Sequence, residues 1–236
     1  MHTYHTIALL TDFGLADAYV GAIKGVIYSI APRVCIVDIS HDIPPQDVQA
    51  AAYVLWSAYR YFPRKSVFVA VVDPGEGTDR PIVCVKSADY LFLAPDNGLL
   101  KFVLADQRPY TAFAVTNARL WLPEVSSSFH GRDILAPVST HLASGVSLSQ
   151  VGKRTRLMTQ AEPFVNVRGN QTGSHKSCVI HVDRFGNLIT NLRLMEIPKK
   201  RSRKAMRIGN RWDFSLAGSQ KHHQAIPSYL RRGSAA

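Results

Sequence analysis

The chain has 236 residues, of which 46% are hydrophobic, and its formal net charge is +11. This is enough apolar material to bury the core of one large domain, or of a large domain and a small one. Its apolar stretches are strand-sized, and its start lacks a basic region and a cleavage site, so we exclude a membrane protein and expect a soluble, cytoplasmic one.

The positive charge is concentrated near the C-terminus. Residues 198–236 carry ten Lys or Arg against a single Asp, whereas residues 1–197 carry 18 basic and 16 acidic side chains. A basic tail can bind polyanions without sequence preference. A solvated end without a partner has the same composition, and we favour that interpretation. We therefore do not expect nucleic acid as a partner.

Strand-like and helix-like patterns alternate along the first 146 residues. Short β-branched runs predict strands, and apolar residues at helical spacing predict helices. In chain order we expect a strand over 6–10, a helix over 19–29, a strand over 34–38, a helix over 46–61, strands over 67–72, 82–85 and 91–94, a short helix over 97–104, a strand over 111–115 and a helix over 132–143. This order predicts an α/β domain over residues 1–150 with a mainly parallel sheet and helices on both faces.

The rest of the chain has a different composition. Gly, Asn, Gln and Ser concentrate between residues 166 and 177, so we place a linker over 151–176. Strands over 178–182 and 188–190 then flank a turn, which predicts a small β domain over 177–236.

The end of this second domain is less regular. From about residue 194 the chain turns basic, and Ile208, Trp212 and Phe214 look scattered rather than alternating. We therefore expect the second domain to be divergent or truncated from this point.

The chain has three cysteines, Cys35, Cys84 and Cys178. They are far apart in sequence, odd in number, and each lies in an apolar segment. This pattern favours buried, reduced thiols over disulfides or metal ligands.

Two polar loops directly follow or begin strongly apolar elements, in VVDPGEGTDR (71–80) and SFHGRDILAP (128–137). Loops at the carboxyl edge of an α/β sheet are where such folds bind ligands. Asp73 closes an apolar run, and the Pro and Gly residues behind it force a tight turn that ends at Arg80. Asp73, Arg80 and His130 are therefore the candidate site residues.

Asp12 also ends a predicted strand, and its role is open on this pattern. A carboxylate in this position can accept hydrogen bonds from both hydroxyls of a ribose. It can equally cap the helix that begins after the turn from Gly14 to Tyr19.

Six segments together resemble the S-adenosylmethionine hydroxide adenosyltransferases, also called adenosine-forming S-adenosylmethionine (SAM) hydrolases. The segments occur in order between residues 6 and 193 and have compatible spacing. They are LLTDFGLADAYVGAIKGVI (9–27), ISHDIPPQDV (39–48), VVDPGEGTDR (71–80), APDNGLL (94–100), FHGRDILAPV (129–138) and VDRFGNLITN (182–191). The resemblance implies hydrolysis of SAM to adenosine and L-methionine. It also implies an N-terminal α/β domain, a C-terminal β-barrel-like domain, a homotrimer with the substrate at a subunit interface, and no metal or redox cofactor.

The resemblance also assigns roles to individual residues. Asp73, Arg80 and His130 correspond to the set that activates water, and Asp12 to the residue that binds the ribose hydroxyls. In the second domain, Asp183 would receive the methionine ammonium, and Phe185 and Asn187 would help to form the purine and amino-acid pocket.

The related SAM-dependent halogenases differ at two of these places. By the same resemblance they carry a halide-binding serine where this chain has Gly131, and a tyrosine where it has Asp73. A carboxylate repels a halide ion, so the sequence favours water as the nucleophile. Glu76 is a departure from the family, which usually has a small apolar residue there. If Glu76 and Asp73 face one pocket, each raises the pKa of the other.

Three alternatives stay open. An incomplete second domain would leave a protein that binds SAM or adenosine with little or no turnover. A metal-dependent hydrolase would use His41, Asp42, His130 and Asp133, although their spacing matches no compact ligand motif. A non-enzymatic protein would bind RNA through the basic tail.

Overall fold

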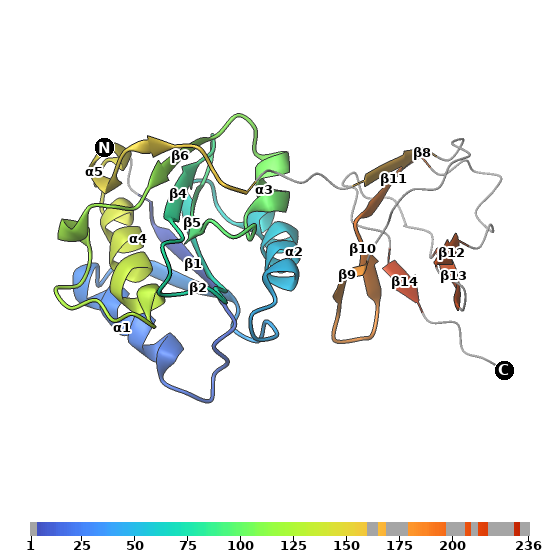
Figure 1. Cartoon of the computed structure of the whole chain (residues 1–236), viewed down its shortest axis with the longest axis horizontal. Coiled ribbons are helices and arrows are strands. Elements are labelled where there is room, and N and C mark those ends of the chain that lie inside the picture. The colour runs from blue at the N-terminus through green and yellow to red at the C-terminus, as the bar shows by residue number, and fades with distance from the viewer. Residues whose placement is uncertain are drawn as a thin grey trace. The chain divides into compact units, whose positions relative to one another are not determined.

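The computed structural model divides the chain into two compact units, residues 1–163 and 164–236 (Figure 1). It describes residues 4–159 and 179–191 with their side chains, and the backbone of the strands at 165–168, 192–196, 206–208, 212–216 and 229–231. The boundary between the units lies inside the segment for which the composition predicts a linker.

The first unit is built on one sheet. Its strands are β1 (Thr6–Thr11), β2 (Cys35–Ser40), β3 (Ser66–Val71), β4 (Ile82–Lys86), β5 (Leu91–Pro95), β6 (Thr111–Ala114) and β7 (Arg154–Thr155), in the order β2-β1-β3-β5-β4-β6-β7. The predicted α/β class is confirmed, and β2, β1, β3 and β5 are parallel. The other pairings are antiparallel. The four residues between β4 and β5 explain the change, because a parallel pair needs a crossover of a dozen or more.

Helices cover both faces of this sheet (Figure 1). They are α1 (Tyr19–Ile30), α2 (Val48–Ala58), α3 (Lys101–Asp106), α4 (Ala136–Ala143) and α5 (Leu148–Val151). On one face α1 packs on α4, and α4 packs on β1 and β3; on the other, α2 packs on α3, β1 and β2. All six residues of β3 are buried, which explains why its sequence is continuously apolar. Among the described residues, no helix is long and apolar enough to cross a bilayer.

Two helices begin differently from the sequence prediction. The helix expected from residue 97 starts at Lys101, because Asn97, two residues beyond β5, holds a turn in which its side chain donates to Val72 O (2.8 Å) and accepts from Leu99 N–H (3.1 Å). The helix expected over 132–143 begins as a π-helical turn, Gly131–Leu135, and continues as α4. Both changes lie beside the candidate site residues.

The cysteine prediction is right for one thiol and wrong for another. Cys84 is buried in β4, and burial raises the pKa of its thiol to about 12. Cys35 is exposed, because β2 is the outer strand of the sheet and, among the described strands, pairs only with β1. Cys178 lies outside the described residues.

The second unit contains the predicted hairpin. Strands β9 (Val179–Val182) and β10 (Leu188–Thr190) pair antiparallel around the turn at residues 183–187. They belong to a five-stranded sheet, β12-β13-β14-β10-β9, in which the other members are β12 (Met206–Ile208), β13 (Trp212–Leu216) and β14 (Tyr229–Arg231). A parallel pair, β8 (Val165–Arg168) and β11 (Leu192–Glu196), also belongs to this unit.

The predicted loss of strand pattern after residue 194 is therefore wrong for β12 to β14. Trp212, Phe214 and Leu216 do alternate with polar residues, but over a run too short to stand out among so many basic side chains. Strands β7 and β8 also fall inside the segment predicted as a linker.

Packing of the first unit gives a stability prediction at Gly152. A Cβ atom there would lie 2.0 Å from Ala114 O in β6 and 2.7 Å from Thr116 Oγ1. Because the nearer atom belongs to the backbone, we expect Gly152→Ala to lower the free energy of unfolding by about 2–3 kcal/mol. The measurement is urea denaturation. Gly25→Ala is the control, since no atom lies within 4 Å of a Cβ there. If Gly152→Ala unfolds at the same urea concentration as wild type, this packing is wrong.

Candidate active site

The candidate residues of the first unit follow strands that end side by side. Thr11 at the end of β1 is the Cα partner of Val71 at the end of β3. On the other side of β1, Leu10 is the partner of Ser40 at the end of β2. Asp12 directly follows β1, and Asp73 lies two residues beyond β3. The loops after β1, β2 and β3 therefore leave the same carboxyl edge, where ligands bind in open α/β sheets.

The tight turn predicted after Asp73 folds Arg80 back onto it. Asp73 Oδ1 pairs with Arg80 Nη1 and accepts a hydrogen bond from Gly75 N–H (3.1 Å). The side chain of Asp73 is 11% exposed and that of Arg80 is 30% exposed. Gly75 makes this possible, because a Cβ there would lie 2.5–2.7 Å from the Arg80 guanidinium. Asp73 and Arg80 thus form one ion pair at the end of β3.

The loop that carries His130 lies against this turn. Gly77 has a φ of +82°, and a Cβ there would lie 2.5 Å from Ser127 O, so the two backbones touch. Glu76 Oε1 also accepts a hydrogen bond of 2.7 Å from the backbone N–H of His130. Residues more than 50 positions apart are therefore joined directly, and the loop of Asp73 and Arg80 contacts the loop of His130.

Glu76 is the residue of this junction that the pattern did not assign. Its pKa is raised, mainly by burial and slightly by the charge of Asp73, against the opposing effects of the N–H groups of His130 and Gly131 and of the His130 charge. The sequence shows that Glu76 is charged where the family resemblance places a small apolar residue. The sequence gives no signal that its side chain binds a backbone N–H group.

An aromatic cluster joins the Asp12 loop to the His130 loop. Phe13, Tyr19 and Phe129 contact one another edge to face or tilted, with ring centroids 5.2–5.8 Å apart. Phe129 is nearly buried, whereas 49% of Tyr19 is exposed. Since Phe13 follows Asp12 and Phe129 precedes His130, this cluster holds those two candidate residues at the same edge.

Gly131 lies beneath this cluster, in the first turn of the π-helical segment. A Cβ there would lie 3.3 Å from Val71, 3.4 Å from Ile23 and 3.5 Å from Phe13, all apolar side chains. A serine hydroxyl at this position would enter a tight apolar space.

Asp12 does not cap α1. The residue at the N-cap is Ala18, without a side-chain hydrogen bond. Asp12 Oδ2 instead accepts a hydrogen bond of 2.7 Å from Gln46 N–H, in the loop after β2. Its Oδ1 accepts none from the residues that the structure describes. The capping alternative is wrong, and one carboxylate oxygen of Asp12 is available to a ligand.

Two residues of the metal alternative, His41 and Asp133, have other partners. His41 is buried, with Nδ1 2.8 Å from Thr11 Oγ1 and Nε2 3.1 Å from Asp38 Oδ1. The Asp133 side chain is fully buried, pairs with Arg132 at 2.5 Å and accepts from Ser126 N–H at 2.9 Å. Burial opposes ionisation of Asp133, but these bonds prevail and lower its pKa. Within residues 4–159 and 179–191, no three His, Cys, Asp or Glu side chains are grouped to hold a metal ion.

The candidate residues of the second unit lie together in its hairpin turn. Asp183 Oδ1 accepts from the N–H groups of Phe185 and Asn187, both at 2.9 Å, and Oδ2 accepts from Asn187 Nδ2 at 2.7 Å. The Phe185 side chain is 89% exposed. Asp183 therefore shapes the turn that presents Phe185.

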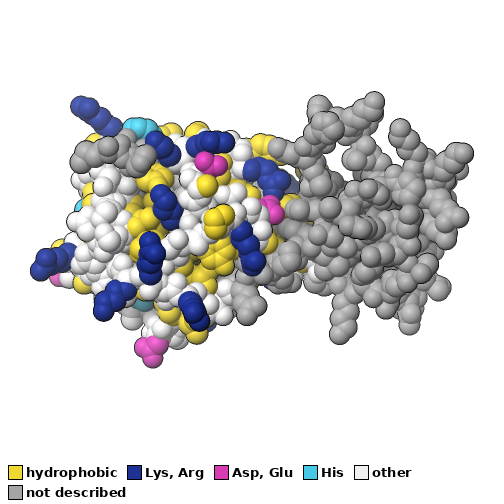
Figure 2. All heavy atoms as spheres, turned by 90° about the horizontal axis from the view of Figure 1, so that it is seen from above, with side chains coloured by type: hydrophobic (Ala, Val, Ile, Leu, Met, Phe, Trp, Pro, Cys, Tyr) yellow, Lys and Arg dark blue, Asp and Glu magenta, His cyan; other side chains and the backbone are white. Residues whose placement is uncertain are grey.

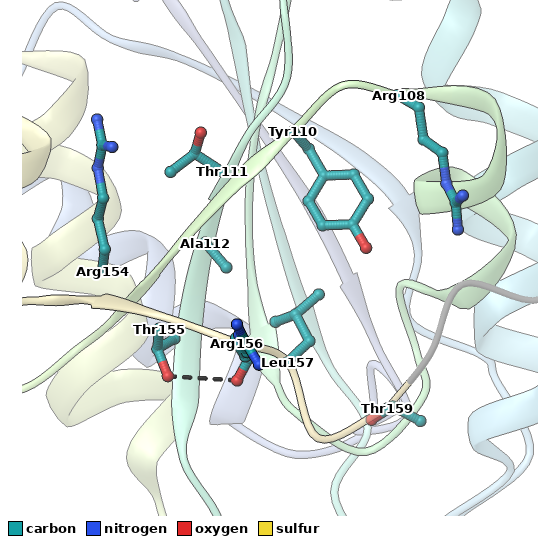
Figure 3. A pocket seen from close by; sticks show the side chains of 9 residues that line it. All are labelled: Arg108, Tyr110, Thr111, Ala112, Arg154, Thr155, Arg156, Leu157 and Thr159. Atoms are coloured by element: carbon teal, nitrogen blue, oxygen red, sulfur yellow. Dashed lines mark hydrogen bonds between the residues drawn. The ribbon is translucent and has the colours of Figure 1, made fainter.

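A cleft of about 420 Å³ lies elsewhere on the first unit, over β6 and β7 (Figure 3). Its lining residues are Arg108, Tyr110, Thr111, Ala112, Arg154, Thr155, Arg156, Leu157 and Thr159. None of these is a candidate site residue. Arg108 and Arg154 lie on opposite sides of Tyr110, so they do not converge on one anion (Figure 3). The candidate residues lie instead at the strand ends, where hydrogen bonds and an ion pair join their loops.

The surface of the first unit gives no sign of a nucleic-acid site on the face seen in Figure 2. Lys and Arg side chains are spread over it singly, with hydrophobic side chains between them. A protein that binds the phosphate backbone of nucleic acids instead has its Lys and Arg side chains clustered along one face or groove.

Comparison with known proteins identifies close relatives. The family described as "SAM hydroxide adenosyltransferase N-terminal domain" matches residues 7–152. A Salinispora tropica protein named (R)-S-adenosyl-L-methionine hydrolase is 39% identical over 183 residues, covering 77% of this chain and 70% of its own. A Thermus thermophilus protein of the same name is 37% identical, covering 79% and 74%. A crystal structure of an uncharacterized conserved protein from Thermotoga maritima has a TM-score of 0.68 at 38% identity, covering 78% and 71%. The family match includes Asp12, Asp73, Arg80 and His130.

Proposed function

The chain belongs to the SAM hydroxide adenosyltransferase family, and we propose that it hydrolyses S-adenosyl-L-methionine to adenosine and L-methionine. The observation that carries this proposal is the junction of the Asp73 turn with the His130 loop, inside the matched segment. The names of the relatives favour turnover over a protein that only binds SAM or adenosine.

The chemistry of SAM sets the task for these residues. The sulfonium at the ribose 5′ carbon leaves as a neutral thioether, so the leaving group needs little help. Water is the weak partner, and its proton must be accepted as oxygen attacks. The bond from oxygen to C5′ forms while the bond from C5′ to sulfur breaks, and the sulfur takes the electron pair. Charges of opposite sign merge if hydroxide attacks, so a site without bulk water suits the reaction.

Asp73 is suited to hold that water. Arg80 and Gly75 N–H fix one carboxylate oxygen, Oδ1, whereas Oδ2 accepts no hydrogen bond from the described residues. We assign Oδ2 to the water and His130 to its other side. Arg80 orients the carboxylate rather than accepting the proton. Positioning one water in line with the C5′–sulfur bond can supply several kcal/mol of the rate enhancement.

Asp12 is proposed to bind the ribose hydroxyls. Replacing it with Ala removes Oδ1, and we expect the affinity for adenosine to fall about 10- to 100-fold, the range for hydrogen bonds to a charged group. Calorimetric titration with adenosine measures this without turnover. Asp12→Asn is the control, because the amide oxygen can still accept from Gln46 N–H. Unchanged affinity in Asp12→Ala would exclude ribose binding by this residue.

The remaining assignments concern the second unit and the assembly. Asp183 is proposed to receive the methionine ammonium, and Phe185 and Asn187 to contribute to the purine and amino-acid pocket. Their clustering in one turn supports a shared role. We propose a homotrimer with the substrate at a subunit interface. Sedimentation equilibrium should give three times the mass of the chain, and a monomer would reject this part.

The activity itself is tested with purified protein and SAM in excess chelator. Since the relatives are named for the (R) form, both epimers at sulfur should be supplied separately. We expect equal amounts of adenosine and methionine on chromatography, with no cofactor added. Substrate that binds but stays intact would favour the binding alternative. Activity that returns only with a divalent metal would favour the metal-dependent one.

A further inference from the structure

Glu76 connects the two halves of the proposed catalytic set and has no role in the mechanism above. Its backbone N–H donates to Asp73 O at 3.2 Å. Its side chain accepts from His130 N–H at 2.7 Å. One residue is therefore bonded to both Asp73 and His130, which come from loops far apart in sequence.

We propose that Glu76 is a positioning residue that fixes His130 relative to Asp73, an inference that rests on the proposed function. The Glu76 carboxylate meets the first N–H groups of a helical segment that runs from Gly131 through α4. These groups lack partners within the helix and carry partial positive charge, so a carboxylate binds them strongly. Small apolar side chains, which the family resemblance places here, cannot make this bond.

The contact at Gly77 limits how the Glu76 bond can position the two loops. Because the Gly77 and Ser127 backbones already touch, the two loops cannot approach more closely. The Glu76 bond prevents them from separating. Together the two contacts fix the spacing of the Asp73 loop and the His130 loop, between which the proposed function places the reacting water.

Protonation of Glu76 affects stability and positioning in opposite directions. Asp73, which is paired with Arg80, faces it from its own loop, and His130 faces it from the other. Its raised pKa means that folding favours the protonated form, so the associated stability is present at low pH and is lost as the pH rises through that pKa. The bond to His130 N–H is strongest in the ionised form, at higher pH. A residue that only supports the fold would change stability with pH but would not change kcat in the opposite direction.

The test compares Glu76→Ala, Glu76→Gln and a control, Asp79→Asn, which removes one negative charge from an exposed position of the same loop. We expect Glu76→Ala to lower kcat about 10- to 100-fold with little change in KM, as for a misplaced catalytic group. Glu76→Gln keeps an acceptor, so it should recover most of kcat near neutral pH. It should lose one ionisation from the acidic limb of the kcat profile and melt at a higher temperature than wild type at neutral pH. Asp79→Asn should match wild type in kcat and in the acidic limb.

A second readout does not depend on turnover. The amide resonance of His130 should shift with pH in wild type, with a midpoint above the ordinary Glu value of about 4.3, and this step should vanish in Glu76→Gln. The inference would be overturned if the His130 amide resonance titrated in Glu76→Gln as it does in wild type, or if Glu76→Ala kept wild-type kcat. Either result would leave the proposed function standing. If the amide titrates as expected but wild type produces no adenosine, the proposed function fails, and the catalytic role of Glu76 fails with it.

Discussion

Asp73→Asn and His130→Ala are each expected to lower kcat for SAM hydrolysis by about 10²- to 10⁴-fold, the range for loss of a general acid or base. Asparagine can still accept from Gly75 N–H, but it cannot take a proton from water or form an ion pair with Arg80. Binding of adenosine should hold, because neither residue is assigned to the nucleoside. Steady-state formation of adenosine and calorimetric titration measure the two effects separately.

A matched control comes from another Asp and Arg pair. Asp89 lies in the turn between β4 and β5, and its carboxylate is 3.6 Å from the guanidinium of Arg64. The side chain of Arg64 is 82% exposed. Exposed pairs of this kind contribute little, so Asp89→Asn should retain wild-type kcat. If Asp73→Asn or His130→Ala also retained it, the assignment of that residue to water activation would be wrong. The double variant should be no worse than about the poorer single one, since the two groups act on one water.

Gly75→Ala is expected to lower kcat by about 100-fold although it replaces none of the proposed catalytic side chains, because small misplacements are costly. The added Cβ would lie 2.5–2.7 Å from the Arg80 guanidinium, so Arg80 must leave Asp73. The displaced group is the end of a flexible side chain, and the fold should therefore survive. The measurement is kcat beside the melting temperature.

The control for this variant is Gly21→Ala in α1, where no atom lies within 4 Å of a Cβ. It should retain kcat and should not lower the melting temperature, because Ala is favoured over Gly in a helix. Wild-type kcat in Gly75→Ala would show that the pairing of Arg80 with Asp73 is not needed for turnover.

Much of the fold was predictable because local patterns determine it. The continuous apolar run of β3 and the spacing of α1 and α2 indicate their structure directly. The order of strands in the sheet is not local information. Cys35 looks like a core residue in its own segment, and only the position of β2 at the edge of the sheet makes it exposed. The strands after residue 200 were missed because each is short and lies among basic residues.

The candidate site also has features that the local sequence predicts and features that it does not. Pro74, Gly75 and Gly77 predict the turn that brings Arg80 back to Asp73, because this turn is local. The convergence with His130 was expected from strand ends and family resemblance, and its physical basis is the contact at Ser127. The bonds of Glu76 to His130 N–H and of Asp12 to Gln46 N–H were not predictable. Every residue except proline carries such an N–H, so a backbone partner leaves no mark in the sequence.

The most direct test of the account is to follow the oxygen atom. SAM should be hydrolysed in water enriched in oxygen-18, and the oxygen-18 content of the adenosine and methionine formed should be measured by mass spectrometry. Attack of water on the 5′ carbon predicts one heavy oxygen in each newly formed adenosine and none in methionine. Adenosine formed without the label, or no adenosine at all from an intact preparation, would contradict the account.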